Sequence, residues 1–167
     1  VFELPFMANK DAEKSSVAFH EFVTTHAKEE FKDVKLLAVH VNGPGVLHTK
    51  TPVNTLEDLK GMRVRGASRI VNMTLEQMGA IPVGMPAPAV SEALSKGVIS
   101  GTSLQWEVVP ALRIQQMVKN HTITHGERGL YTGTFAFVMN RNTYDKLPPD
   151  LKKVIDNNSG PQVAALF

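Results

Sequence analysis

The sequence predicts an α/β fold built around a run of parallel strands. Between residues 62 and 101, short strand-like segments alternate with helical segments, and a glycine follows each helical segment. Strand, helix and strand at this spacing are typical of parallel strands joined by right-handed crossovers. In such sheets ligands bind outside the carboxyl ends of the strands, so we expect a binding site at that edge.

The chain before this unit predicts one helix and one strand. Residues 11–31 carry apolar side chains at helical spacing, which predicts a long helix. A buried strand is expected over residues 34–41. The sequence from Asn42 to Gly45 contains two glycines and a proline, and it predicts a sharp turn.

The central unit opens with a helix-start signal, because Thr55 is followed three residues later by Asp58, close to a capping box. We expect Arg65, Pro86 and residues 102–106 to emerge at the carboxyl ends of the strands. The predicted elements are a turn at 55–61, a strand at 62–67, a helix at 68–78, a strand at 81–83, a helix at 88–96 and a strand at 98–101.

After the central unit, a helix is expected over residues 107–118. Pro110 is tolerated only in a first helical turn, so this helix is expected to begin near Val108 or Val109. The remaining predicted elements are strands at 121–125 and 131–140, a helical turn at 143–147 and a last helix at 148–158.

Composition excludes several classes of protein. A chain of 167 residues with 43% apolar residues can bury a core, while a net charge of +2 without a basic cluster does not suggest a nucleic-acid or membrane surface. Absence of cysteine excludes disulfides and thiol catalysis. The longest uncharged strand-like run, residues 129–140, is too short for the roughly 20 residues of a membrane-spanning helix. The first residues lack the features of a signal peptide, and the last ones look like an interrupted helix, so we expect a fragment with sequence missing at both ends.

Arg65 is the sharpest candidate for a functional residue. A guanidinium at the end of a strand presents parallel donors that match a carboxylate in bidentate geometry. The alternative is an ion pair with a nearby acid of the chain, such as Glu107. Arg63, two residues earlier, is a second candidate, and it can instead lie along the edge of the sheet.

Aromatic and glycine residues supply weaker candidates. Trp106, Tyr131 and Phe135 are either walls of a pocket or part of the core, and we favour a binding role for Phe135 because its strand follows the central unit. Gly45, after Pro44, either lets the backbone approach a ligand closely or only forms a turn.

The histidines and hydroxyls do not predict a metal site or an enzyme. His121 and His125 share one face of a predicted strand but are separated by about 13 Å, and a third ligand is not apparent. His48 is expected in a solvated loop. Nucleophile-elbow, phosphate-loop and dinucleotide-binding motifs are absent, and the hydroxyls of residues 100–103 have no histidine placed as their base. We therefore expect no cofactor and no catalysis.

The sequence resembles a known family. The extracytoplasmic solute-binding proteins of tripartite ATP-independent periplasmic (TRAP) transporters, of the dicarboxylate-binding DctP-like type, have similar motifs in the same order and spacing. The segments that carry the resemblance are residues 55–65, residues 79–86, residues 92–101 and residues 142–148.

This resemblance implies a two-lobed, clam-shell architecture like that of type II periplasmic binding proteins. Residues 1–41 would belong to the first lobe, residues 42–130 to the second, and residues 131–167 would return to the first. Such a protein captures an organic acid in the cleft between its lobes and delivers it to the membrane subunits of a TRAP transporter. The resemblance thus implies a periplasmic binding protein that neither spans the membrane itself nor binds nucleic acid.

The resemblance also implies ligand contacts. Arg65 ends the Lys-Gly-x-x-x-Arg pattern and would hold the ligand carboxylate, with Ser68 near it and Leu104 at the position of a polar contact. Three departures from the pattern favour a smaller or more apolar carboxylate than a sugar acid. Ser100 replaces the usual Asp, Leu104 replaces an amide, and Gly45 stands where sialic-acid-binding members have a second Arg.

Two other functions remain open. A ligand-sensing module of a signalling receptor would share the site and differ in its partner. An enzyme of the same architecture would need an acid–base pair, for which Glu107 and His48 are the candidates.

Overall fold

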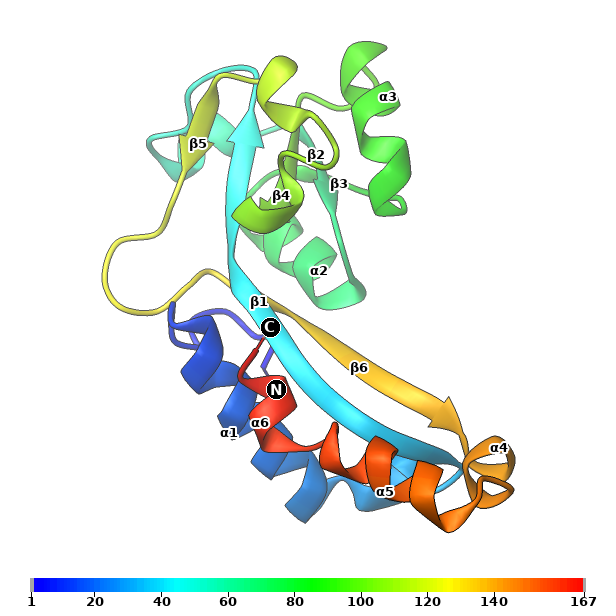
Figure 1. Ribbon diagram of the computed structural model, residues 1–167. Coiled ribbons are helices and arrows are strands. Elements are labelled where there is room, and N and C mark those ends of the chain that lie inside the picture. The colour runs from blue at the N-terminus through cyan, green and yellow to red at the C-terminus, as the bar shows by residue number, and fades with distance from the viewer. Residues whose placement is uncertain (1, 167) are drawn as a thin grey trace. The chain divides into compact units, whose positions relative to one another are not determined.

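The computed structural model describes residues 2–166 and confirms the predicted α/β fold (Figure 1). Contacts divide the chain into two units. The first contains the residues up to Lys10 together with Gly43–Gly133, and the second contains Asp11–Asn42 and the residues from Thr134 onward. The predicted first lobe took in residues 1–41, so the first ten residues fall differently in the two divisions. The assignment of lobes stays a prediction.

The first unit contains the predicted parallel strands. Strands β2 (Arg63–Gly66), β3 (Ile81–Gly84) and β4 (Gly101–Gln105) lie parallel in the order β3-β2-β4. The sheet continues through β1 (Val34–Thr49) and β5 (Asn120–Thr122), which pair antiparallel. The chain leaves β2 for β3 on one side and reaches β4 on the other, so the strand order reverses at β2. A reversal of this kind is where open α/β sheets bind their ligands.

Local signals place the helices of this unit. Helix α2 (Arg69–Gln77) starts at Ser68, whose Oγ accepts a hydrogen bond from the Val71 N–H at 3.3 Å. Gly79 and Gly97 follow the predicted helices with φ of 92° and 69°, the left-handed conformation that ends helices at low cost. The second helical segment is a 3-10 turn, η3 (Ala87–Ala89), followed by α3 (Val90–Ser95).

The predicted capping box also forms. The carboxylate of Asp58 accepts a hydrogen bond from the Thr55 N–H at 2.8 Å and caps the 3-10 turn η2 (Leu56–Leu59). The prediction of a turn at 55–61 is therefore confirmed.

Strand β4 begins later than predicted. The N–H groups of Val98 and Ile99 both donate to the carbonyl of Ala93, which prolongs the end of α3 instead of starting a strand at residue 98. As a result, residues 102–105 lie within β4 rather than beyond its end.

The prediction of a continuous helix over residues 107–118 is wrong. The structure has two 3-10 turns, η4 (Trp106–Val108) and η5 (Ile114–Gln116). Between them Arg113 adopts a left-handed conformation with φ of 53°, and Pro110 has no N–H to contribute to a helix.

The prediction of a sharp turn at residues 42–45 is also wrong, because β1 runs through this segment to Thr49. The Gly43 N–H donates to Oε1 of Glu107 at 2.6 Å, and the Gly45 N–H donates to the carbonyl of Tyr131 at 2.9 Å. These partners keep the glycine-rich segment extended by supplying the hydrogen bonds that a strand requires.

The second unit contains the remaining helices. Helix α1 (Ala12–His26) is followed by the 3-10 turn η1 (Lys28–Phe31), so the predicted single helix is interrupted near residue 27. Helix α1 packs against α6 (Pro161–Ala164) (Figure 1). The other elements are β6 (Thr132–Asn140), which pairs with β1, and the helices α4 (Arg141–Asp145) and α5 (Pro149–Asn157).

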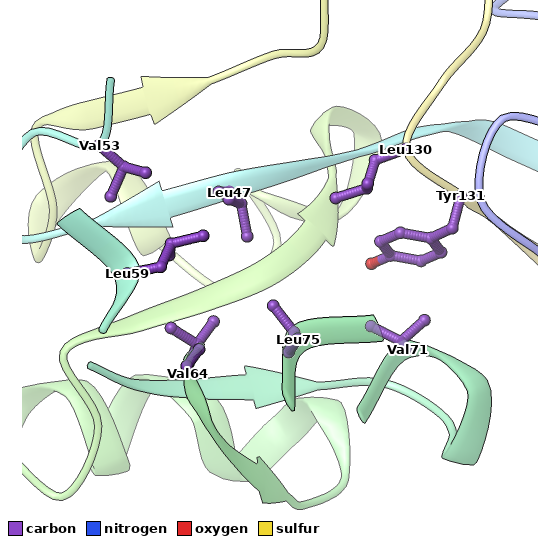
Figure 2. Packing of buried hydrophobic residues seen from close by; sticks show 9 residues of the cluster. Leu47, Val53, Leu59, Val64, Val71, Leu75, Leu130 and Tyr131 are labelled. Carbon is purple, nitrogen blue, oxygen red and sulfur yellow. The ribbon is translucent and has the colours of Figure 1, made fainter. Parts of the chain in front are cut away.

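The first unit has two hydrophobic clusters, which contain α2 and α3 respectively. In the first, side chains from the strands converge on α2 with the Tyr131 ring at one end (Figure 2). This cluster consists of Leu47, Val53, Leu59, Val64, Val71, Leu75, Ala80, Leu130 and Tyr131. The second consists of Val90, Ala93, Leu94, Ile99, Leu104, Val109, Ile114 and Val118.

His48 is buried within this unit and not in a solvated loop, because β1 extends past it. Its Nε2 lies 3.2 Å from the carbonyl oxygen of Leu104, and its Nδ1 lies 2.7 Å from Nδ1 of His121. A carbonyl oxygen can only accept, so Nε2 of His48 carries the proton and Nδ1 accepts from His121. Burial is the main reason that the pKa of His48 is lowered to about 4, and the charge of a protonated His121 lowers it further.

We predict that Leu75→Ala lowers the free energy of unfolding by about 2–5 kcal/mol, the range for truncating a buried leucine. Leu75 is only 1% exposed, whereas Met73 on the same helix is 52% exposed. Met73→Ala is the matched control and should cost less than about 1 kcal/mol. Urea denaturation measures both variants, and equal losses would contradict the assignment of Leu75 to the core.

We predict that His48 makes the folded state less stable as the pH falls from about 6.5 to about 4. In this window the unfolded chain takes up a proton on this histidine and the folded chain does not, so the loss reaches about 3 kcal/mol. Burial also lowers the pKa of His20 and of His40, which act in the same direction. To isolate the contribution of His48, urea denaturation measures the free energy of unfolding of the wild type and of His48→Gln at pH 7 and pH 4.5. The contribution of His48 is the part of the loss between the two pH values that His48→Gln does not show. Equal pH dependence in the two proteins would refute it.

Candidate functional site

The candidate site lies where the parallel strands of the first unit end. Arg65 is the residue before the last in β2, and it is paired with Val83 of β3 and Thr102 of β4. Val83 is next to the last residue of β3, whereas Thr102 is the second residue of β4. The register brings the backbone after β3 and within β4 close to the guanidinium.

Arg65 is a buried cation held by backbone carbonyl groups. Its side chain donates from Nε to the carbonyl of Met85 at 3.0 Å and, at a longer distance of 3.5 Å, from Nη1 to the carbonyl of Ser103. Arg65 is 4% exposed. Among residues 2–166, no salt bridge joins Arg65 to a carboxylate. Burial lowers the pKa of Arg65, but an arginine stays protonated in a protein.

The ion pair between Arg65 and Glu107 does not form in this structure, and the rival candidate Arg63 has a partner of its own. Glu107 accepts a hydrogen bond from the Gly43 N–H and does not pair with Arg65. Arg63 lies at the start of β2, is exposed and donates to the carbonyl of Gly97 at 2.7 Å. Strand β2 lies between β3 and β4, so Arg63 is at the start of an inner strand and not on an edge strand.

Tyr131 and Ser103 lie next to Arg65. The Ser103 hydroxyl donates to the Tyr131 hydroxyl at 3.0 Å, and the Ser103 carbonyl is the one that Arg65 contacts. Burial raises the pKa of Tyr131 to about 12, although the hydrogen bond from Ser103 and the charge of Arg65 act against the rise. The phenol is therefore neutral at physiological pH and keeps its proton.

Gly45 makes room for the ring of Tyr131. A Cβ atom at residue 45 would lie 2.0 Å from Cε1 of Tyr131, a distance at which the ring would have to move. The close approach that Gly45 permits in this structure is thus made by a protein side chain. Whether Gly45 also approaches a ligand stays a prediction.

Ser68 lies at the amino end of α2, directly after β2. Its hydroxyl donates to Oε2 of Glu3 at 3.0 Å, which brings a carboxylate from the first residues of the chain to this end of the sheet. Glu3 also acts on the phenol of Tyr131, since its negative charge contributes to the raised pKa of Tyr131.

Trp106 follows β4 and is 46% exposed, so part of the indole can contact other molecules. Its ring packs on His48 and His121, with ring centroids 5.0 Å and 4.8 Å apart. It lines a small cavity of about 190 Å³ together with Lys10 and Gly45. The position of Trp106 at the end of a central strand agrees with the predicted region of the site.

The side chain of Leu104 packs in the core in this structure, and a ligand contact at this position stays a prediction. Consecutive residues of a strand point to opposite faces, and here Ser103 points to Tyr131 while Leu104 points into the second hydrophobic cluster. Leu104 is 3% exposed, so in this structure its side chain is a core residue. Its backbone carbonyl, not its side chain, makes the polar contact at this position, to His48.

Pro86 and Phe135, two further candidates for ligand contact, lie in different units of the structure. Pro86 precedes η3 and is exposed next to Met85, whose carbonyl accepts from Arg65. Phe135 belongs to the second unit, where it is 46% exposed and stacks on His40 with ring centroids 5.3 Å apart. A ligand contact at either residue stays a prediction.

Sequence reasoning missed two neighbours of the site, Glu3 and Asn72. Asn72 on α2 lies so close to Gly66 that a Cβ atom there would be 2.0 Å from its Oδ1. In the part of the chain that the structure describes, this buried Oδ1 has no hydrogen-bond partner. Helical periodicity predicts that Asn72 lies one turn after Ser68, but it does not predict that Gly66 leaves space for its amide.

Two apolar cavities of the first unit are lined by residues other than Arg65. One of about 630 Å³ is lined by residues such as Leu4, Phe6 and Met73, and another of about 320 Å³ is lined by residues such as Leu47 and Leu59. Residues 2–166 contain no cluster of three or more groups that could hold a metal ion. None of the helices described is both long enough and apolar enough to cross a membrane.

Comparison with solved structures shows the same fold along the whole chain. A TRAP solute-binding protein from a marine metagenome, specific for aromatic acid ligands and solved with 3-hydroxybenzoate, is 48% identical with a TM-score of 0.95. A TRAP solute-binding protein from Rhodoferax ferrireducens, solved with copurified benzoate, is 49% identical with a TM-score of 0.94. Each match covers 99% of this chain and 52% of the other.

Sequence comparison leads to the same family. The C4-dicarboxylate-binding periplasmic protein DctP of Rhodobacter capsulatus is 28% identical over 160 residues, which are 91% of this chain and 45% of that protein. The chain thus spans about half the length of the relatives that it matches. The family model for bacterial extracellular solute-binding proteins, family 7, matches residues 1–161. Because this match covers nearly the whole chain, the chain belongs to the DctP family of bacterial extracellular solute-binding proteins.

Proposed function

We propose that this chain forms part of a periplasmic solute-binding protein that captures an organic acid and delivers it to the membrane subunits of a TRAP transporter. Membership of the DctP family supports the class of function. The observation that carries the proposal is the buried guanidinium of Arg65, whose described hydrogen bonds go only to backbone carbonyls.

The electrostatics of Arg65 favour an anionic ligand. A buried charge without a counter-ion costs several kcal/mol, and two bonds to neutral carbonyls offset only part of this cost. Two hydrogen bonds also leave N–H donors of the guanidinium unused. A ligand carboxylate supplies both the missing charge and two acceptor oxygens in the geometry that arginine matches best.

We propose that the acid is aromatic. The two structures compared above are 48% and 49% identical to this chain, and they hold 3-hydroxybenzoate and benzoate. Exposed Trp106 offers an apolar surface near the strand ends, which suits an aromatic ring. At residue 45 the ring of Tyr131 fills the space that a second arginine would need. This packing supports an apolar acid over a polyhydroxylated sugar acid.

We propose further that the ligand is released unchanged. The hydroxyl of Ser103 donates to Tyr131, and that of Ser68 donates to Glu3. Neither contact pairs a hydroxyl with a histidine that could act as its base. His48 contacts His121 and the carbonyl of Leu104, so it does not form an acid–base pair with Glu107.

We predict that Arg65→Ala in the full-length protein weakens benzoate binding by at least about 30-fold, because truncating one partner of a buried charged pair costs about 2–5 kcal/mol. Arg65→Lys should lose less affinity than Arg65→Ala, because the ammonium keeps the positive charge. It should still bind more weakly than the wild type, because an ammonium cannot reproduce the bidentate geometry of the guanidinium. Isothermal titration calorimetry measures these affinities. A second aromatic acid, 3-hydroxybenzoate, is titrated in parallel.

Arg63→Ala is the matched control, because Arg63 lies on the same strand but is exposed and bonded to Gly97. Its affinity should stay within about threefold of the wild type, as surface substitutions usually have small effects. Circular dichroism verifies that the variants are folded. If folded Arg65→Ala binds the acids as tightly as Arg63→Ala does, the proposed role of Arg65 is wrong.

A further inference from the structure

Glu3 brings a negative charge to the same end of the sheet as Arg65. Its carboxylate accepts a hydrogen bond from Ser68, the residue that caps α2 only three positions after Arg65. Glu3 is partly buried, so solvent screens its charge less than that of a surface carboxylate. Glu3 and Arg65 belong to the same unit of the structure.

Tyr131 links the two charges. The negative charge of Glu3 raises the pKa of Tyr131, while the positive charge of Arg65 lowers it, so both groups act on one phenol. Ser103 connects this phenol with Arg65 through its hydroxyl and its carbonyl. The guanidinium donates to the carbonyl of Met85, and the carboxylate of Glu3 accepts a hydrogen bond from Ser68.

A cation and an anion near one neutral phenol can distinguish ligands by their number of negative charges and by whether they carry a hydrogen-bond donor. The cation attracts a ligand carboxylate, and the nearby anion repels a second negative charge. The anion also accepts a hydrogen bond from a donor such as a hydroxyl, and hydrogen bonds to charged groups are stronger than those between neutral groups. Ligands with one carboxylate and one donor therefore fit this pattern best.

We propose that Glu3 is a specificity-determining residue that selects acids carrying a hydrogen-bond donor, such as hydroxylated aromatic acids, over unsubstituted acids and dicarboxylates. Ser68 is the positioning residue that holds the Glu3 carboxylate at the end of α2. This inference rests on the proposed function, because it requires Arg65 to hold the ligand carboxylate.

The test compares aromatic acids that differ in one substituent. The probes are benzoate, its three monohydroxy derivatives and the corresponding benzenedicarboxylates, titrated calorimetrically into the full-length protein. We expect the wild type to bind at least one hydroxybenzoate about 10-fold or more tightly than benzoate, the effect of a hydrogen bond to a charged acceptor. The dicarboxylates should bind more weakly than benzoate.

Glu3→Gln should reduce the preference for the hydroxy acid by about 5- to 10-fold and narrow the gap between benzoate and the dicarboxylates. Ser68→Ala should change both ratios in the same direction by less, because the carboxylate remains but is held less firmly. Glu57→Gln is the matched control, since Glu57 is an exposed carboxylate of the same unit that pairs with Lys60 at 2.6 Å. It should leave the ratios unchanged.

Two results would overturn the role of Glu3. One is a wild type that binds the hydroxy acids no more tightly than benzoate, and the other is a folded Glu3→Gln protein with wild-type ratios. If Glu3→Gln does not fold, the ratios of Ser68→Ala decide, and unchanged ratios reject the inference. The proposed function fails separately, if the wild type binds none of the acids or if Arg65→Ala retains full affinity.

Discussion

The burial of one guanidinium constrains the rest of the site. Arg65 lies in the interior, where a charge is costly, and its backbone partners come from two neighbouring segments, Met85 after β3 and Ser103 in β4. Both carbonyls reach Arg65 only because β3 and β4 flank β2 in parallel register. A shift of either strand by one residue would turn these carbonyls away and leave the cation without polar partners.

The contacts of Gly45 and Tyr131 hold the fold together and also shape the candidate site. Strand β1 passes through Gly45 without turning, and its backbone binds the carbonyl of Tyr131. Because Gly45 has no side chain, the ring of Tyr131 can lie against this strand and reach Ser103 with its hydroxyl. Tyr131 therefore belongs to the hydrophobic cluster with its ring and to the polar site with its hydroxyl.

Local patterns predicted part of this arrangement and long-range contacts decided the rest. The spacing of the strands and the glycines that end the helices, Gly79 and Gly97, predicted that Arg65 lies at the end of an inner strand. These signals could be read from the sequence because each one acts within a few residues. The turn expected before Gly45 does not form, since the acceptor for the Gly43 N–H, on Glu107, lies 64 residues away. Leu104 is a core residue because β4 begins at Gly101, which spacing alone did not determine. The contact between Glu3 and Ser68 spans 65 residues and has no local signal.

Because Tyr131 is neutral, it does not act as an internal counter-ion for Arg65. If the phenol were ionised, it would act as an internal counter-ion for the guanidinium, and a ligand carboxylate would gain little by binding there. Burial and the charge of Glu3 both raise the pKa of Tyr131, to about 12, and so hold the phenol in its protonated form. Ser103 donates to this phenol and thereby leaves its O–H proton free for another acceptor. The packing of Tyr131 against Gly45 thus places a neutral hydroxyl, and not a counter-ion, beside the contact between Ser103 and Arg65.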